Sequence, residues 1–178
     1  MKIITGIYGG RRFDAPKNLP ARPTTDVAKQ ALFNILENRL DFEGAHCLDL
    51  FAGTGSISFE MLSRGAAQVT AVEMGRIQQQ FILKVAGELQ IPRGQLNLIR
   101  GDVFRYLKAA NPGFDLVFAD PPYALPELAT LPDLVLPLLG PDTLFILEHG
   151  KENDFTEHPN FVEIRTYGAV HFSFFAQK

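Results

Sequence analysis

The stretch HCLDLFAGTGS, residues 46–56, passes from an apolar run through Asp49 into a turn with glycines at positions 53 and 55. An apolar run that ends in a glycine-containing turn before a helical pattern is typical of a buried strand that leads to a ligand site. Glycine lets the backbone turn tightly and approach a ligand that a Cβ atom would block. A dinucleotide-binding fingerprint needs a third glycine where this chain has Ser58, so the turn alone does not define the ligand.

Similar apolar runs recur along the chain. The expected strands are His46–Leu50, Gln68–Val72, Leu96–Ile99, Leu116–Ala119 and Leu144–Leu147, with helical spacing between them near 56–64, 75–89, 103–110 and 127–139. Apolar residues on both faces fit a buried parallel sheet, and the alternation of strand and helix implies right-handed crossovers. Two further runs, Phe161–Thr166 and Val170–Ala176, predict an antiparallel hairpin. The expected fold class is α/β: a Rossmann-like, doubly wound, mostly parallel sheet with an antiparallel C-terminal hairpin.

The front of the chain has a different pattern. Residues 2–15 alternate around Gly9-Gly10, which predicts an N-terminal β-hairpin extension. A proline-rich link follows, and Thr24 and Thr25 offer an N-cap for an amphipathic helix over residues 25–40. We therefore expect residues 1–40, a basic hairpin and helix, to pack on a main domain formed by residues 41–178.

The charge is unevenly distributed along a chain of ordinary globular composition. The chain has 178 residues, 46% of them hydrophobic, and a net charge of −3. Residues 1–39 hold seven Lys or Arg against three Asp or Glu, whereas the remainder holds ten against seventeen. A basic arm on an acidic body suits phosphate contact at one end, although a solvated surface segment has the same pattern.

Several classes of protein are excluded by composition. The single cysteine, Cys47, excludes a disulfide framework and a thiolate zinc cluster, and the four histidines show no ligand spacing, so we expect no metal. The chain lacks an apolar stretch long enough to span a membrane, and its N-terminus lacks the apolar run of a signal peptide. We expect a cytoplasmic protein with no membrane partner, and a monomer by default.

Acidic residues follow three consecutive predicted strands. Asp49 ends the first, Glu73 follows the second, and Asp102 follows the third. A carboxylate after the second strand is placed to accept hydrogen bonds from both hydroxyls of a ribose, although an acidic helix N-cap has the same position. An acid beside the glycine turn repels a pyrophosphate but suits a cationic ligand. An adenosine that carries a sulfonium satisfies all three positions, so the pattern favours S-adenosylmethionine as the cofactor.

The fourth strand ends in the most specific motif of the chain, Asp120-Pro121-Pro122-Tyr123. The two prolines stiffen the backbone and lack N–H donors, so the Pro121 carbonyl and the Asp120 carboxylate can together accept the two N–H bonds of a planar amino group. Tyr123 offers a flat surface on which a base can stack. Such acceptors stabilise the positive charge that develops when an exocyclic amine attacks a methyl group. A plain Pro-Pro turn, with Tyr123 as packing, is the structural alternative.

Together these motifs resemble those of class I methyltransferases that modify exocyclic amines. The front of the chain narrows the resemblance to the RsmD-type family, which methylates N2 of a guanine in 16S ribosomal RNA; the matching segments are 10–12, 22–26, 31–36 and 62–66. The resemblance implies a cofactor site at Asp49, Phe51, Gly53, Gly55, Glu73, Asp102 and Val103. It also implies a catalytic loop formed by Asp120, Pro121, Pro122 and Tyr123.

The family resemblance further implies that the basic N-terminal segment meets 16S RNA or the small ribosomal subunit. The expected RNA contacts are Arg11, Arg12, Arg22, Thr24 and Lys29. The chain departs from the family pattern in two places. Val27, Lys29 and Gln30 stand where the family usually has an arginine, a second arginine and a glutamate, and Gly75 stands where an aspartate often follows the ribose-binding acid.

The Asp-Pro-Pro-Tyr motif does not by itself distinguish guanine N2 from adenine N6. An adenine-N6 methyltransferase acting on DNA or RNA is therefore an alternative. A ribosome-assembly factor that binds cofactor and RNA without turnover is a second, and a nicotinamide oxidoreductase is disfavoured by Ser58 and the Pro-Pro loop.

Overall fold

The computed structural model describes residues 1–19 and 24–178 as a seven-stranded sheet with the order β3-β2-β1-β4-β5-β7-β6. The strands are β1 (His46–Leu50), β2 (Gln68–Glu73), β3 (Leu96–Arg100), β4 (Phe114–Ala119), β5 (Leu139–His149), β6 (Phe161–Tyr167) and β7 (Val170–Ala176). The five neighbouring strands β3, β2, β1, β4 and β5 pair in parallel. Strand β7 is antiparallel to both of its neighbours, β5 and β6. The predicted fold class and C-terminal hairpin are confirmed.

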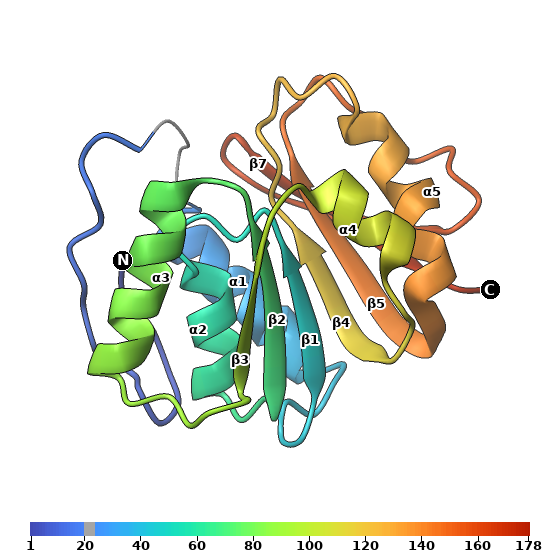
Figure 1. Cartoon of the computed structure of the whole chain (residues 1–178). Helices are drawn as coiled ribbons and strands as arrows, with labels where there is room; N and C mark the ends of the chain where they lie inside the picture. The colour runs from blue at the N-terminus through green and yellow to red at the C-terminus, as the bar shows by residue number, and fades with distance from the viewer. Residues whose placement is uncertain (20–23) are drawn as a thin grey trace.

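Helices cover both faces of this sheet (Figure 1). They are α1 (Asp26–Glu37), α2 (Ser56–Ser63), α3 (Arg76–Glu88), α4 (Val103–Ala109) and α5 (Leu131–Val135). Successive side chains of β1 point to opposite faces, so Cys47 packs with α1, α2 and α3, whereas Leu48 packs with α4 and α5. Two hydrophobic cores result, one on each face of the sheet. Within the described part of the chain, every helix falls short of the length and apolarity needed to cross a membrane.

The observed elements differ from the expected ones where edge position or proline intervenes. Strand β3 is not buried on both faces as expected, because it lies at the edge of the sheet: Asn97 and Arg100 are exposed and its other side chains are only partly buried. The helix expected over 127–139 is broken into a 3-10 turn (Leu128–Thr130), the short α5 and a second 3-10 turn (Leu136–Leu138). Pro132 and Pro137 each stand at the start of one of these pieces, and proline supplies no N–H to a continuous helical ladder.

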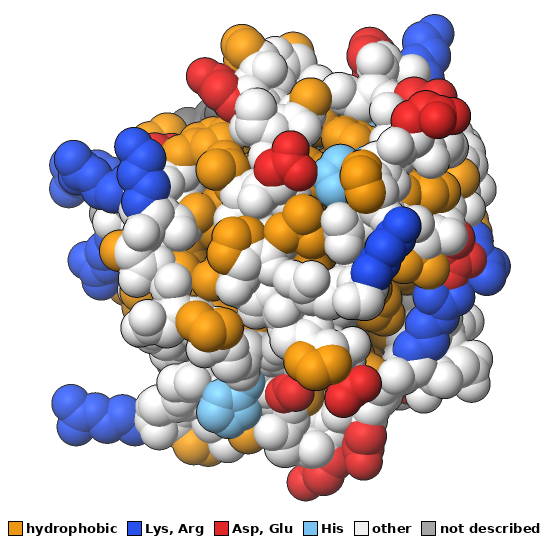
Figure 2. Space-filling model, turned by 90° about the vertical axis from the view of Figure 1, so that its right-hand side faces the viewer, with side chains coloured by type: hydrophobic (Ala, Val, Ile, Leu, Met, Phe, Trp, Pro, Cys, Tyr) orange, Lys and Arg blue, Asp and Glu red, His pale blue; other side chains and the backbone are white. Residues whose placement is uncertain are grey.

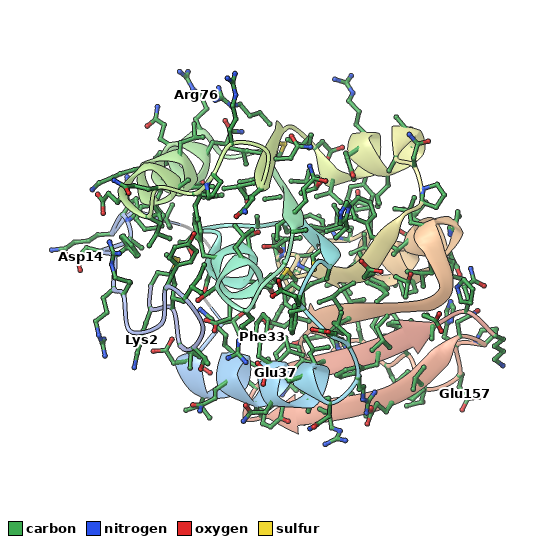
Figure 3. The ribbon with its side chains drawn as sticks, turned by 90° about the horizontal axis from the view of Figure 1, so that it is seen from below. Lys2, Asp14, Phe33, Glu37, Arg76 and Glu157 are labelled. Atoms are coloured by element: carbon green, nitrogen blue, oxygen red, sulfur yellow. The ribbon has the colours of Figure 1, made fainter. Side chains whose placement is uncertain are left out.

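The N-terminal segment folds back on itself without forming the two strands of the expected hairpin. One isolated antiparallel bridge joins Lys2 to Arg12. Backbone hydrogen bonds join Ile3 to Gly10 and Arg11, and Met1 to Phe13. The segment is also held to α2 by the buried carboxylate of Glu60, which accepts the backbone N–H groups of Ile4 at 2.8 Å and Thr5 at 3.1 Å. Figure 3 shows Lys2 and Asp14 on the side of α1 and α3, and Glu157 at the opposite side of the molecule.

Parallel pairing brings the carboxyl ends of β1, β2, β3, β4 and β5 to one edge of the sheet. The loops at this edge carry the acidic residues and the Asp-Pro-Pro-Tyr motif that the sequence singles out. This edge is therefore where a ligand site of an open α/β sheet is expected.

Candidate active site at the carboxyl edge of the sheet

Asp49 is a buried acid at the end of β1. Its carboxylate accepts a hydrogen bond of 2.6 Å from the hydroxyl of Ser58 on α2, and the residue is 1% exposed. Burial raises the pKa of Asp49 to about 7, although the Ser58 hydrogen bonds act in the opposite direction. Ser58 thus stands at the third position of the incomplete glycine fingerprint because its hydroxyl binds the strand-end acid.

The turn after Asp49 depends on unusual backbone conformations. Gly53 and Gly55 have φ of 58° and 81°, values that favour glycine, and Phe51 adopts φ of 60° despite its side chain. A Cβ on Gly55 would lie 2.8 Å from the Phe59 ring, so this glycine is needed for packing. A Cβ on Gly53 would meet no atom of the described residues within 4 Å, so Gly53 leaves open space at the turn.

Glu73, at the end of β2, joins two loops. One of its carboxylate oxygens accepts the N–H of Gly53 at 2.7 Å, and the other accepts the N–H of Gly75 at 2.8 Å. The N-cap of α3 is Gly75 rather than Glu73, so the alternative of an acidic helix cap does not describe this residue. The carboxylate therefore fixes the glycine turn against the start of α3.

Asp102 and Val103 lie at the start of α4. Asp102 is the N-cap, and its carboxylate accepts the N–H of Arg105 at 3.3 Å while the side chain remains exposed. Val103 is buried among the residues beneath α4. The Phe104 and Phe51 rings pack edge to face with their centroids 6.3 Å apart, which links this segment to the turn after β1.

The Asp-Pro-Pro-Tyr loop follows β4 directly beside β1. The backbone N–H of Asp120 donates to the Leu50 carbonyl at 3.2 Å, which fixes the loop next to the glycine turn. Pro121 is buried and Pro122 exposed. Burial raises the pKa of Asp120 well above its usual value, and the neighbouring negative charge of Glu148 raises it further.

Glu148, near the end of β5, completes this group of residues. Its Oε1 accepts the Thr24 hydroxyl at 2.6 Å and its Oε2 accepts the Tyr123 hydroxyl at 2.8 Å. The Thr24 hydroxyl oxygen also lies 3.3 Å from Asp120 Oδ2. Glu148 was missed from the sequence because the fifth strand was expected to end at Leu147; the acid that follows this run was the available signal.

The expected RNA contacts fall in different places. Arg11 and Arg12 are exposed on the N-terminal segment, and Arg22 lies outside the described residues. Thr24 reaches the loop beside Asp120. The expectation for Lys29 is wrong, because this side chain is completely buried and its Nζ binds Glu60, Ser56 and the Lys2 carbonyl.

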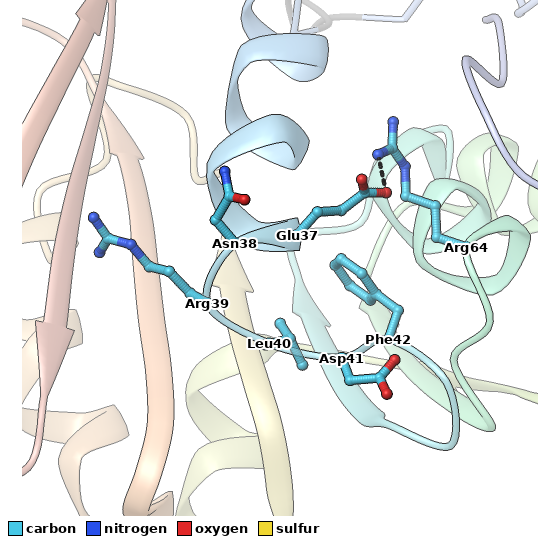
Figure 4. Close-up of a pocket in the computed structure, with 7 residues that line it drawn as sticks. All are labelled: Glu37, Asn38, Arg39, Leu40, Asp41, Phe42 and Arg64. Carbon is cyan, nitrogen blue, oxygen red and sulfur yellow. Dashed lines mark hydrogen bonds and ion pairs between the residues drawn. The ribbon is translucent and has the colours of Figure 1, made fainter.

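A hollow on the surface lies away from this site (Figure 4). It is lined by Glu37, Asn38, Arg39, Leu40, Asp41, Phe42 and Arg64, between the end of α1 and the segment that leads to the start of β1. The start of β1 is at the edge of the sheet opposite to Asp120. Among residues 1–19 and 24–178, no cluster of three or more His, Cys, Asp and Glu side chains could hold a metal ion.

Solved structures of methyltransferases share this fold. "Putative methyltransferase yhhF from Escherichia coli" superimposes with a TM-score of 0.86 at 29% identity, and the match covers 100% of this chain and 98% of that one. A precorrin-6y C5,15-methyltransferase from Geobacter metallireducens gives a TM-score of 0.71 at 19% identity over 93% of each chain. The molecule has the Rossmann-like fold of these methyltransferases.

The sequence comparison identifies the family. The model of the family described as "Conserved hypothetical protein 95" matches residues 1–176, so the chain belongs to this family. Ribosomal RNA small subunit methyltransferase D of Escherichia coli (strain K12) is 35% identical over 123 residues, which are 69% of this chain and 60% of that protein. The Haemophilus influenzae protein of the same name is 36% identical over 125 residues, 69% of this chain and 64% of that protein.

These comparisons confirm the resemblance that the motifs indicated. The chain spans about three fifths of the length of the first curated relatives that it matches.

Proposed function

We propose that this protein transfers the methyl group of S-adenosylmethionine to the exocyclic N2 of a guanine in 16S ribosomal RNA. The observation that carries the proposal is the placement of Asp120-Pro121-Pro122-Tyr123 at the end of β4, held against β1 by the Asp120–Leu50 hydrogen bond. The carboxylate of Asp120, a hydrogen-bond acceptor, thus lies next to the end of the strand that leads into the glycine turn, and Tyr123 follows three residues later in the same loop. The names of relatives that methylate small-subunit ribosomal RNA support the choice of substrate.

The residues around the glycine turn fit the proposed cofactor. Gly53 leaves open space that a side chain would fill, and its N–H already fixes the Glu73 carboxylate. Each Glu73 oxygen accepts one backbone N–H, so each keeps a lone pair that can accept a ribose hydroxyl. Phe51, Gly55, Asp102 and Val103 would complete the site, and Asp49 would stay behind the turn as a buried acid.

The proposed reaction is a direct displacement at the methyl carbon. S-adenosylmethionine supplies an electrophilic methyl group when bound. Asp120 accepts an N–H of the target amine and stabilises the positive charge that develops on nitrogen, with the Pro121 carbonyl as a second acceptor. Tyr123 stacks on the base, which must leave its helix at a cost of about a few kcal/mol. Correct placement of the amine supplies much of the rate enhancement.

The proposed RNA-facing part is the segment 1–40. Its exposed arginines, Arg11 and Arg12, can contact phosphates, and its Thr24 reaches the catalytic loop. The face of the molecule in Figure 2, which shows the right-hand side of Figure 1, carries Lys and Arg mainly near its margins rather than as a continuous patch. A ribosomal substrate also implies action in the cytoplasm.

Labelled methyl transfer to small ribosomal subunits that lack the modification, followed by nucleoside mass spectrometry, tests the proposal. N2-methylguanosine at one site is the expected product. N6-methyladenosine as the product would instead identify the protein as an adenine-N6 methyltransferase. Cofactor binding without methyl transfer would favour a ribosome-assembly factor. Asp120→Ala serves as the control: it should abolish turnover while cofactor affinity stays within a few-fold.

A further inference from the structure

Glu148 is a buried acid whose surroundings differ from those of an ordinary core residue. It is 2% exposed, and its carboxylate oxygens accept hydrogen bonds from the hydroxyls of Thr24 and Tyr123. A side-chain hydrogen bond with Glu148 also contributes to the raised pKa of the neighbouring Asp120. The ion pairs of residues 1–19 and 24–178 do not include it. Burial of a carboxylate is costly, and the two hydroxyl hydrogen bonds offset part of that cost.

The two hydroxyl groups come from two segments that are distant in sequence. Thr24 immediately precedes the N-cap of α1, whereas Tyr123 ends the Asp-Pro-Pro-Tyr motif. One carboxylate therefore ties the N-terminal segment to the loop proposed to hold the base. The ring of Tyr123 also lies close to the backbone beyond β5, because a Cβ on Gly150 would be 3.0 Å from its Cδ2 atom.

The Thr24 hydroxyl has one proton and two carboxylates within reach. Its oxygen lies 2.6 Å from Glu148 Oε1 and 3.3 Å from Asp120 Oδ2, so the shorter hydrogen bond goes to Glu148. Glu148 thereby takes a donor that would otherwise occupy Asp120. The Asp120 oxygen keeps its capacity to accept an N–H from a substrate amine.

We propose that Glu148 is a positioning residue for the reaction proposed above: by binding the hydroxyls of Thr24 and Tyr123, it orients the aromatic ring and keeps the Asp120 carboxylate available to the target amine. This inference rests on the proposed function, because it assigns the role relative to Asp120 and Tyr123. Glu148 acts through these residues and does not itself contact the reacting atoms.

The role has a consequence for pH dependence. The titratable groups that face Asp120 are Glu148 and, from β1, Asp49. Those around Glu148 are Asp120 and Tyr123, with His149 adjacent to it on β5 and His171 opposite His149 on β7. The negative charge of Glu148 raises the pKa of Asp120. Its removal should therefore let Asp120 ionise at lower pH.

The test compares Glu148→Gln, Tyr123→Phe and the double variant with the unchanged protein. Single-turnover methyl transfer to small subunits is measured across pH, together with cofactor affinity and thermal unfolding. Glu148→Gln should lower the rate at least about tenfold, leave cofactor affinity within a few-fold, and move the acidic limb of the pH profile to lower pH. Tyr123→Phe keeps the ring and both carboxylates, so it should lower the rate without moving that limb.

The double variant and a control refine the result. The rate losses of the two single variants should not multiply in the double variant, because both changes act on the hydrogen bond between residue 148 and Tyr123. Glu127→Gln, an exposed residue a few positions beyond the loop, removes the same charge and should leave rate and profile unchanged. A wild-type rate in Glu148→Gln, or a lower rate with an unmoved acidic limb, would overturn the proposal.

Failure of the proposed function gives a different pattern. Full activity in Asp120→Ala, or no transfer by the unchanged protein, would contradict the reaction itself. Carboxyl carbon-13 NMR titration of Asp120 then still tests Glu148 without turnover. An Asp120 pKa that is lower in Glu148→Gln than in the unchanged protein supports the coupling on which the positioning role depends, and an equal pKa contradicts it.

Discussion

The Lys29 ammonium lies 3.2 Å from Glu60 Oε1, and both side chains are completely buried. Glu60 also accepts the Arg64 Nε–H at 2.9 Å and the backbone N–H groups of Ile4 and Thr5. Burial lowers the pKa of Lys29 and the nearby Glu60 carboxylate opposes this effect. The charged group therefore joins α1, α2 and the N-terminal segment below the surface.

Removal of the Glu60 charge should destabilise the protein strongly. Glu60→Gln leaves Lys29 without its buried counter-ion and disturbs both backbone contacts, so we expect a loss of about 3–5 kcal/mol in the free energy of unfolding. Lys29→Met should cost less, because Arg64 still neutralises Glu60. Urea unfolding measures both changes.

A matched control uses the other partner of Arg64. Glu37 binds the same guanidinium at 2.6 Å, but its side chain is 49% exposed. Glu37→Gln should therefore cost less than about 1 kcal/mol. Equal losses in Glu37→Gln and Glu60→Gln would show that burial of the ion pair has no special importance.

The raised pKa of Asp49 should make stability depend on pH. The folded protein holds a proton on Asp49 up to pH of about 7, whereas the unfolded chain releases it near 3.8. Stability therefore falls as pH rises through this window, by up to about 4 kcal/mol. In Asp49→Asn this part of the fall should vanish. Urea unfolding at about pH 4.5 and pH 7 tests it, and an equal fall in both proteins would contradict the assignment.

Gly53→Ala separates ligand contact from backbone strain. A Cβ at this position meets no atom of the described residues within 4 Å, so the stability loss should be about 1–2 kcal/mol from the left-handed backbone alone. Affinity for S-adenosylmethionine, measured by calorimetry, should fall at least about tenfold, because the Cβ occupies the open space at the turn. Gly44 also has positive φ, of 78°, and open space, but lies before β1 at the opposite edge of the sheet. Gly44→Ala should therefore lose similar stability and keep full affinity.

Charge reversal at Arg11 and Arg12 should weaken RNA binding. Both residues are exposed, and removal of each phosphate-binding charge should reduce the slope of log affinity against log salt by about 1. The two single variants and the double variant are titrated with small subunits at several salt concentrations. Arg93→Glu, an exposed arginine in the loop before β3, should keep the slope. An unchanged slope in the double variant would show that the basic N-terminal segment is a solvated surface segment that does not contact RNA phosphates.

Much of the fold was predictable because its strands are short apolar runs. His46–Leu50 was predicted with the bounds that the structure has, and Gln68–Val72 was one residue short. Such runs can be recognised in the sequence because a buried parallel strand must be apolar on both faces. The edge strand β3 was predicted less well, because the exposure of its side chains depends on which strands lie beside it. The segment around α5 was also predicted less well, because the effect of a proline depends on whether it falls at the start or in the middle of a helix.

The site was predictable only where its residues adjoin strand ends. Glu73 and Asp120 lie in such positions, and the structure places both at one edge of the sheet. Whether they bind cofactor and base stays a prediction. Lys29 was misplaced because its partner, Glu60, belongs to another helix, so no local pattern distinguishes a buried lysine from a surface one. Glu148 was missed for a similar reason, since its partners at positions 24 and 123 are distant in sequence.

Glu60 holds the N-terminal segment through backbone N–H groups, not through the side chains of Ile4 and Thr5. Every amino acid except proline can supply such a donor. Substitutions at these two positions can thus change the side chains that the N-terminal segment exposes to a partner, while the segment stays bound to Glu60 through its backbone. The choice of target and the proposed methyl-transfer chemistry can therefore diverge separately within one small protein.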